Sequence, residues 1–369
     1  MPRVQILSAG LAALALSPLP AQAVTVDGWN TTNVLVPAGP YAADVTYASV
    51  IYDRDVTGGT AGASSSGEVI FTPPEATAPG IAVLTGAPDL SASQDIPNCI
   101  MASSSASCES SFQSGKRFKL HFTDTGAVDL VFDTSGTGES AYQLFTKFTN
   151  DVGAGLRGFT MELGFGVGDG FSLAGDGAGI AFAPVPDMPD TQFPFGLFGD
   201  AAASSNHDLD GFFAAETTGY LAEWTATKMR ATTGYGPYGD LFGAWTTLDD
   251  APWGYFWDHD GDAGTDAILM AWQTGTGEWE QRRAEDTGEA VPILPTIVGE
   301  ADLISAGYLL GAIEDVSNLN VNAMIAFSDA FDSGSGFTLR ITAAEVPLPA
   351  GAPLLVAGIG ALGLLRRRR

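Results

Sequence analysis

The stretch that decides the fold reads RFKLHF at residues 117–122 and AVDLVF at residues 127–132. In both segments apolar residues alternate with polar ones, which is the period of a β-strand with one buried face. The same alternation recurs at residues 46–52, 142–148 and 337–341. Many short strands separated by Gly-rich turns predict a mainly β body, a β-sandwich or jelly roll with few short helices.

The charge balance limits the class of partner. The 369 residues include 43 acidic and 16 basic side chains, which gives a net charge of −27. Without the terminal segments described below, 11 bases face 43 acids, a net charge of −32. Binding to phosphate backbones needs a clustered basic face, so nucleic acid is excluded as a partner.

The first 23 residues have the pattern of a secretory signal peptide. Arg3 supplies the positive start, residues 6–16 are apolar, and Ala21-Gln22-Ala23 offers a small-x-small cleavage site. We therefore expect the chain to be exported.

The C-terminal segment, residues 346–369, has the pattern of a second sorting signal. The motif Val346-Pro347-Leu348-Pro349-Ala350 precedes an apolar run that ends at Leu365, and four arginines follow. Sixteen residues from 350 to 365 would span about 24 Å as a helix, short of the about 30 Å of a bilayer core. The segment closely resembles the VPLPA-CTERM sorting signal of Gram-negative bacteria. The resemblance implies transient membrane attachment and processing by an exosortase-type enzyme; a permanent anchor is the alternative.

The segment between these ends, residues 24–345, is expected to form one extracellular body with an acidic, aromatic insertion at about 220–290. Residues 300–313 have the best helical pattern, about three turns long. The stretches SGKRFKLH at 114–121 and GFTMELGFG at 158–166 resemble the choice-of-anchor F family of bacterial surface proteins. That resemblance implies surface display and transfers no site residues.

Two cysteines, Cys99 and Cys108, are predicted to form one structural disulfide, because an exported chain meets an oxidising environment. Catalytic signatures are weak. The sequence has no G-x-S-x-G elbow, its three histidines lack metal-ligand spacing, and His121 alternates within a strand as a wall residue would. We predict no enzyme; a glycoside hydrolase using paired carboxylates is the least favoured alternative.

An aromatic run and a short Asp motif are the candidate sugar contacts. Trp253, Tyr255 and Trp257 share one face if their segment is a strand. An exposed face would form a platform for sugar rings, whereas a buried one would belong to the core, which we favour. Asp176-Gly-Ala-Gly resembles the Asp-Gly strand start of legume-lectin-like sandwiches; a plain turn is the favoured interpretation.

The acidic loop at residues 258–266 is the candidate calcium site. Asp258, Asp260, Asp262 and Asp266 have spacings found in calcium loops, although Leu269 stands where an EF-hand needs Glu. A solvated turn is the alternative.

Together these features predict an exported, non-enzymatic cell-surface or extracellular-matrix protein that meets exopolysaccharide. The alternative is a calcium-assisted carbohydrate-binding surface module.

Overall fold

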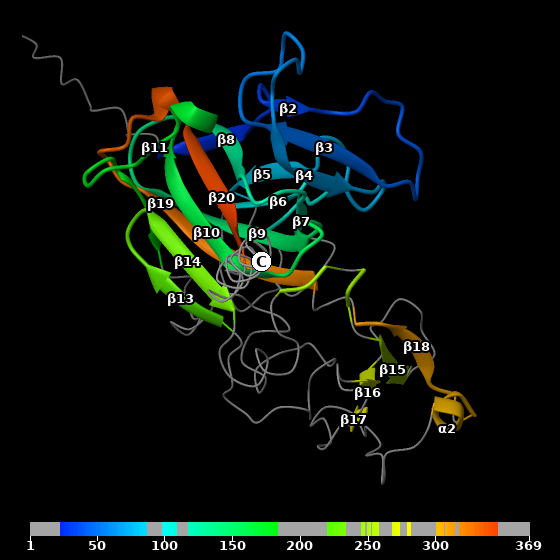
Figure 1. The fold of residues 1–369 in the computed structure, drawn as a ribbon. Helices are drawn as coiled ribbons and strands as arrows, with labels where there is room; N and C mark the ends of the chain where they lie inside the picture. Colours follow the sequence, from blue (N-terminus) through cyan, green and yellow to red (C-terminus); the bar gives the residue numbers. More distant parts are fainter. Residues whose placement is uncertain are drawn as a thin grey trace, which may run out of the picture.

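The structure, a computed structural model, is mainly β, which confirms the predicted fold class. Its strands form two large sheets and one small sheet (Figure 1). It describes residues 23–86, 98–108, 117–183, 220–233, 245–247, 249–251, 253–257, 268–273, 279–281, 300–305, 307–313 and 317–345.

The first large sheet has seven strands and is antiparallel throughout. Its order is β1 (Thr25–Asn30), β8 (Ala127–Ser135), β20 (Phe337–Glu345), β10 (Leu156–Phe165), β14 (Lys228–Thr233) and β13 (Tyr220–Trp224), with β11 (Ser172–Leu173) beside β10.

The second large sheet has nine strands and mixes both directions, because β7 and β6 run parallel to β9. Its order is β12 (Ile180–Ala183), β19 (Asn318–Phe327), β9 (Ser140–Asn150), β7 (Phe118–Phe122), β4 (Ser65–Phe71), β3 (Tyr47–Tyr52) and β2 (Val34–Leu35), with the hairpin β5 (Ile81–Thr85) and β6 (Asn98–Ala102) beside β9.

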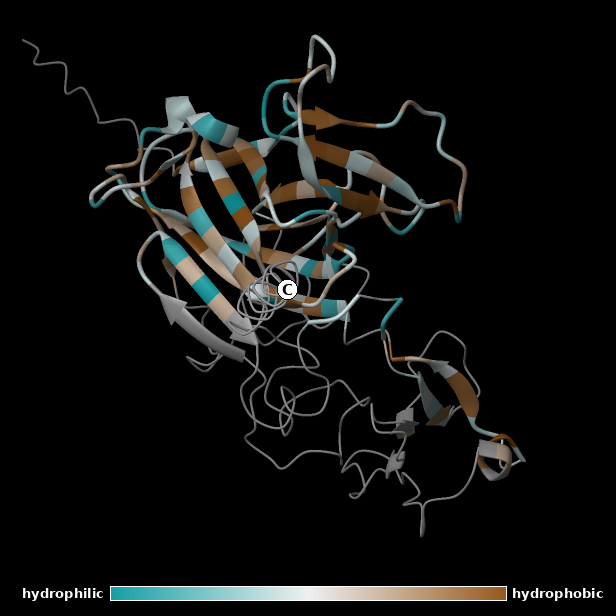
Figure 2. Cartoon of the chain, in the orientation of Figure 1, coloured by the Kyte–Doolittle hydropathy of each residue, from teal (hydrophilic) through white to brown (hydrophobic). Residues whose placement is uncertain are grey.

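The main core lies between the two large sheets. Alternate residues of β8, Val128, Leu130 and Phe132, are buried in it, as the sequence pattern predicts. Aromatic rings meet across the two sheets, because the Phe148 and Phe159 ring centroids are 5.0 Å apart. Figure 2 shows the alternation of apolar and polar residues along these strands. This packing gives the body the layered arrangement of a β-sandwich.

Strand β9 departs from simple alternation because both of its faces are covered. Leu144 and Phe148 lie in the main core, while Phe145 packs in a second cluster with Cys99 and Met101. Strand β6 pairs beside β9 and contributes Cys99 and Met101 to that second cluster, so both faces of β9 bury apolar side chains and the apolar run in this segment is continuous.

The helix predicted at 300–313 is wrong over its second half. Helix α2 (Glu300–Ser305) ends at Ser305, and Gly307, with a φ of 88°, does not continue the helical path. Strand β18 (Leu309–Ala312) then pairs with β15 (Trp253–Trp257). Cross-strand hydrogen bonding to β15 therefore overrides the local helical pattern.

The segment predicted as an acidic insertion is divided between two sheets. Strands β13 and β14 extend the seven-stranded sheet. Strands β16 (Ile268–Gln273) and β17 (Trp279–Gln281) join β15 and β18 in the small sheet. Phe256 and Ala312 of the small sheet pack against the main core.

The predicted signal peptide (residues 1–23) and the predicted C-terminal sorting segment (residues 346–369) lie outside the described residues, apart from Ala23. Within the described part of the chain, no helix combines the length and the apolar character that a membrane span needs.

Candidate functional site

The predicted disulfide is present. Cys99 and Cys108 are bonded, with their Cα atoms 5.8 Å apart, and both side chains are buried. The bridge closes the segment that follows β6 and forms part of the cluster around Phe145. Its role is structural.

The aromatic strand is present as β15, but its three rings have different environments. Trp253 is 58% exposed, whereas Tyr255 is fully buried against Ala271 and Leu303. Trp257 is half-buried. Helix α2 therefore covers the middle of the strand, and the three side chains do not form one continuous exposed platform.

The predicted calcium loop with Asp258, Asp260, Asp262 and Asp266 lies outside the described residues. Among the residues that the structure does describe, no group of three His, Cys, Asp or Glu side chains is placed to hold a metal ion.

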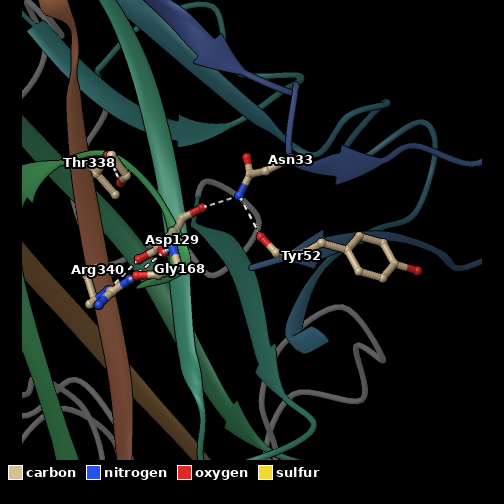
Figure 3. Close-up of polar contacts among 7 residues, drawn as sticks. Asn33, Tyr52, Asp129, Gly168, Thr338 and Arg340 are labelled. Atoms are coloured by element: carbon tan, nitrogen blue, oxygen red, sulfur yellow. Dashed lines mark hydrogen bonds and ion pairs between the residues drawn. The ribbon is translucent and has the colours of Figure 1, made fainter. Parts of the chain in front are cut away.

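A buried ion pair lies on the outer side of the seven-stranded sheet (Figure 3). Arg340 of β20 donates two hydrogen bonds of 2.7 Å to the carboxylate of Asp129 on β8. The same carboxylate accepts the Gly168 N–H, and Arg340 donates to the Gly168 carbonyl, each over 2.7 Å. The guanidinium also lies 3.9 Å from the Phe171 ring centroid. The pair thus holds the loop of η2 (Gly168–Gly170) against the sheet.

Asn33 connects this pair to the other sheet. Its side-chain amide donates to the main-chain carbonyls of Asp129 and Tyr52, each over 3.0 Å (Figure 3). The cluster ties β8, β20, the η2 loop and β3 together, so its polar groups serve the fold.

A second charged cluster lies on the outer face of the nine-stranded sheet. The Nδ1 atom of His121 is 2.5 Å from a carboxylate oxygen of Asp151. Glu68 lies opposite His121 on the neighbouring strand β4, and burial raises the pKa of its carboxyl group. His121, which alternation predicts as a wall residue, is half-buried and hydrogen-bonded there.

A groove of about 340 Å³ opens where the edges of the two large sheets meet. Three segments line it. They are residues 175–177 and 179–181 around the start of β12, the turn at 226–227 between β13 and β14, and residues 326–328 at the end of β19 and just after it. Hydrogen bonds join these segments, because the Phe182 N–H donates to the Ala226 carbonyl over 2.6 Å and the Ser328 N–H to the Gly179 carbonyl over 2.9 Å.

Asp176 lies at this groove, in the motif that the sequence singles out. The Ala178 N–H donates to the Gly175 carbonyl over 3.1 Å, which closes a turn that leaves Asp176 exposed. Of the described residues that line the groove, Asp176 is the one with an ionisable side chain. Lys228, next to the turn at 226–227, is held by Glu162 at 2.7 Å.

The sequence favours a plain turn at Asp176, and the structure shows that turn; the groove was not predicted, because its lining segments are far apart in the chain. The Gly-rich run around Asp176 was the available signal. The groove combines room for a ligand with an exposed charged group.

Comparisons with protein-family models, curated proteins and solved structures find no match for this chain. Fold and site define its class: a disulfide-containing, mainly β protein whose two large sheets pack together, with a groove where their edges meet.

Proposed function

We propose that this protein is an exported cell-surface or extracellular-matrix protein without catalytic activity, sorted by a C-terminal signal that resembles VPLPA-CTERM. The disulfide between Cys99 and Cys108 is the observation that carries the proposal, because disulfides persist in oxidising compartments outside the cytoplasm. The signal-like residues 1–23 and the motif at 346–350 agree with this location. An exosortase-type enzyme is the processing partner.

The charged clusters support a structural rather than a reactive role. The Asp129–Arg340 pair is occupied by contacts with the η2 loop, and Asp129 is only 2% exposed. His121 is hydrogen-bonded to Asp151 on an outer sheet face, and neither residue lines the groove.

Fractionation of a Gram-negative host that has an exosortase tests this proposal. We expect the mature chain outside the inner membrane, beginning near Val24 and lacking residues 366–369, as determined by intact mass. A variant in which serine replaces the four arginines should accumulate as a cell-associated precursor. A cytoplasmic chain that retains residues 1–23 would refute the proposal.

The second candidate is a calcium-assisted carbohydrate-binding surface module, with a glycoside hydrolase as a more distant alternative. The exposed Trp253 ring favours it, since exposed aromatic rings stack on sugars. Glycan-array binding that needs calcium and disappears in a Trp253→Ala variant would favour this candidate over the first. Polysaccharide turnover that disappears on a single Asp or Glu substitution would favour the hydrolase.

A further inference from the structure

We propose that the groove beside Asp176 binds an amino-sugar unit of an extracellular polysaccharide, with the sugar ammonium group against the Asp176 carboxylate. This inference rests on the proposed function, because it requires the β body to lie outside the cell. It adds a ligand class and a site to that function.

The shape of the groove suits a small, rigid ligand. Its volume of about 340 Å³ lies near the lower end of the range of about 300–1,000 Å³ for small-molecule sites. Ala181, Ala226 and Ala326 line it with small side chains, and the buried Ile180 and Phe327 complete its apolar surface. Such walls let the C–H faces of a sugar ring approach closely.

The polar groups of the groove come from all three lining segments. Asp176 belongs to the loop before β12, Thr227 to the turn before β14, and Ser328 to the residue after β19. The two hydroxyl groups can donate and accept hydrogen bonds, whereas an ionised carboxylate only accepts them. A ligand with several hydroxyls and one cationic donor matches this set.

The negative charge at the groove favours a sugar that carries an ammonium group over a neutral or anionic sugar. Asp176 is exposed, and no base is among the described residues that line the groove. The nearby Lys228 is already paired with Glu162 at 2.7 Å. The whole chain carries a net charge of −27, so anionic sugars such as uronates are repelled.

Calorimetric titration of the full-length protein, at mildly acidic pH and physiological ionic strength, tests the proposal. Three β-1,4-linked tetrasaccharides serve as probes: those of glucosamine, N-acetylglucosamine and glucose, which differ only at carbon 2. We expect the glucosamine probe to bind about three- to fivefold more tightly than the other two, which is the upper part of the range for one exposed ion pair.

Two variants assign the binding to the groove. Asp176→Asn should weaken glucosamine binding by about three- to fivefold and remove the preference for the ammonium form. Ala226→Trp should abolish binding of all three probes, because it places a large side chain in the groove on an exposed turn. Asp329→Asn is the matched control: it removes the same charge from an exposed residue adjacent to Ser328 that does not line the groove. It should change binding less than twofold.

The outcomes separate this inference from the proposed function. Equal affinity for the three probes, full binding by Ala226→Trp, or no binding at all would overturn the groove assignment. So would a trilysine peptide that binds as tightly as the glucosamine probe, because it would show recognition of any ammonium group. Fractionation of the host measures the location of the protein and therefore tests the proposed function independently of these binding results.

Discussion

Among substitutions on the outer faces of the two large sheets, removal of the Arg340 guanidinium should be one of the most destabilising. Asp129 is 2% exposed, and in Arg340→Met its carboxylate loses two charge-assisted hydrogen bonds of 2.7 Å. Breaking one side of a buried ion pair costs about 3–5 kcal/mol, because the remaining charge stays desolvated. The Arg340 side chain is 16% exposed, so some water can reach the site and we expect about 3 kcal/mol.

Urea denaturation followed by tryptophan fluorescence measures this free energy of unfolding. Thermal melting should show a midpoint lower by about 6–12 °C, from about 2–4 °C per kcal/mol. The double variant Arg340→Met/Asp129→Asn should recover about 1–2 kcal/mol, because the asparagine is neutral and its carbonyl oxygen still accepts the Gly168 N–H.

A matched control comes from the same sheet. Lys228 and Glu162 also pair across neighbouring strands at 2.7 Å, but Lys228 is 45% exposed. Lys228→Met should therefore cost no more than about 1 kcal/mol. If Arg340→Met costs as little as this control, or if Asp129→Asn gives no recovery, the buried pair does not stabilise the fold as argued.

Three further predictions concern other parts of the body. Burial raises the folded-state pKa of Glu68, so ionisation of its carboxyl group opposes folding. The Glu68→Gln variant should therefore become more stable relative to wild type as the pH rises from about 4 to about 7. A difference in melting temperature that stays constant over this pH range would contradict the prediction. Gly179→Ala should cost about 1–3 kcal/mol in urea melts and more than Gly177→Ala, because both residues have positive φ but a Cβ meets neighbouring backbone only at Gly179. Replacing Cys99 and Cys108 by alanine opens a loop of sequence separation 9 and should lower the free energy of unfolding by about 2.5–3 kcal/mol, detected as a lower urea midpoint.

Several features followed from the sequence by itself because they depend on near neighbours. Alternation over residues 127–132 predicted the strand that the structure shows as Ala127–Ser135, and residues 337–341 predicted Phe337–Glu345. Side-chain direction reverses at each residue of a strand, so a short window is enough to detect it. The disulfide was equally accessible, because two cysteines allow one intramolecular pairing.

Tertiary structure decided the features that depend on which strands become neighbours. Residues 309–312 form a strand in place of the second half of a predicted helix because β15 supplies their hydrogen-bonding partner. Asp129 and Arg340 are 211 residues apart and meet because β8 and β20 are adjacent. The groove at Asp176 likewise joins the end of β19 to the turn before β14. Hydrophobic periodicity specifies which face of a strand is buried, but sheet order depends on how all the buried faces pack together.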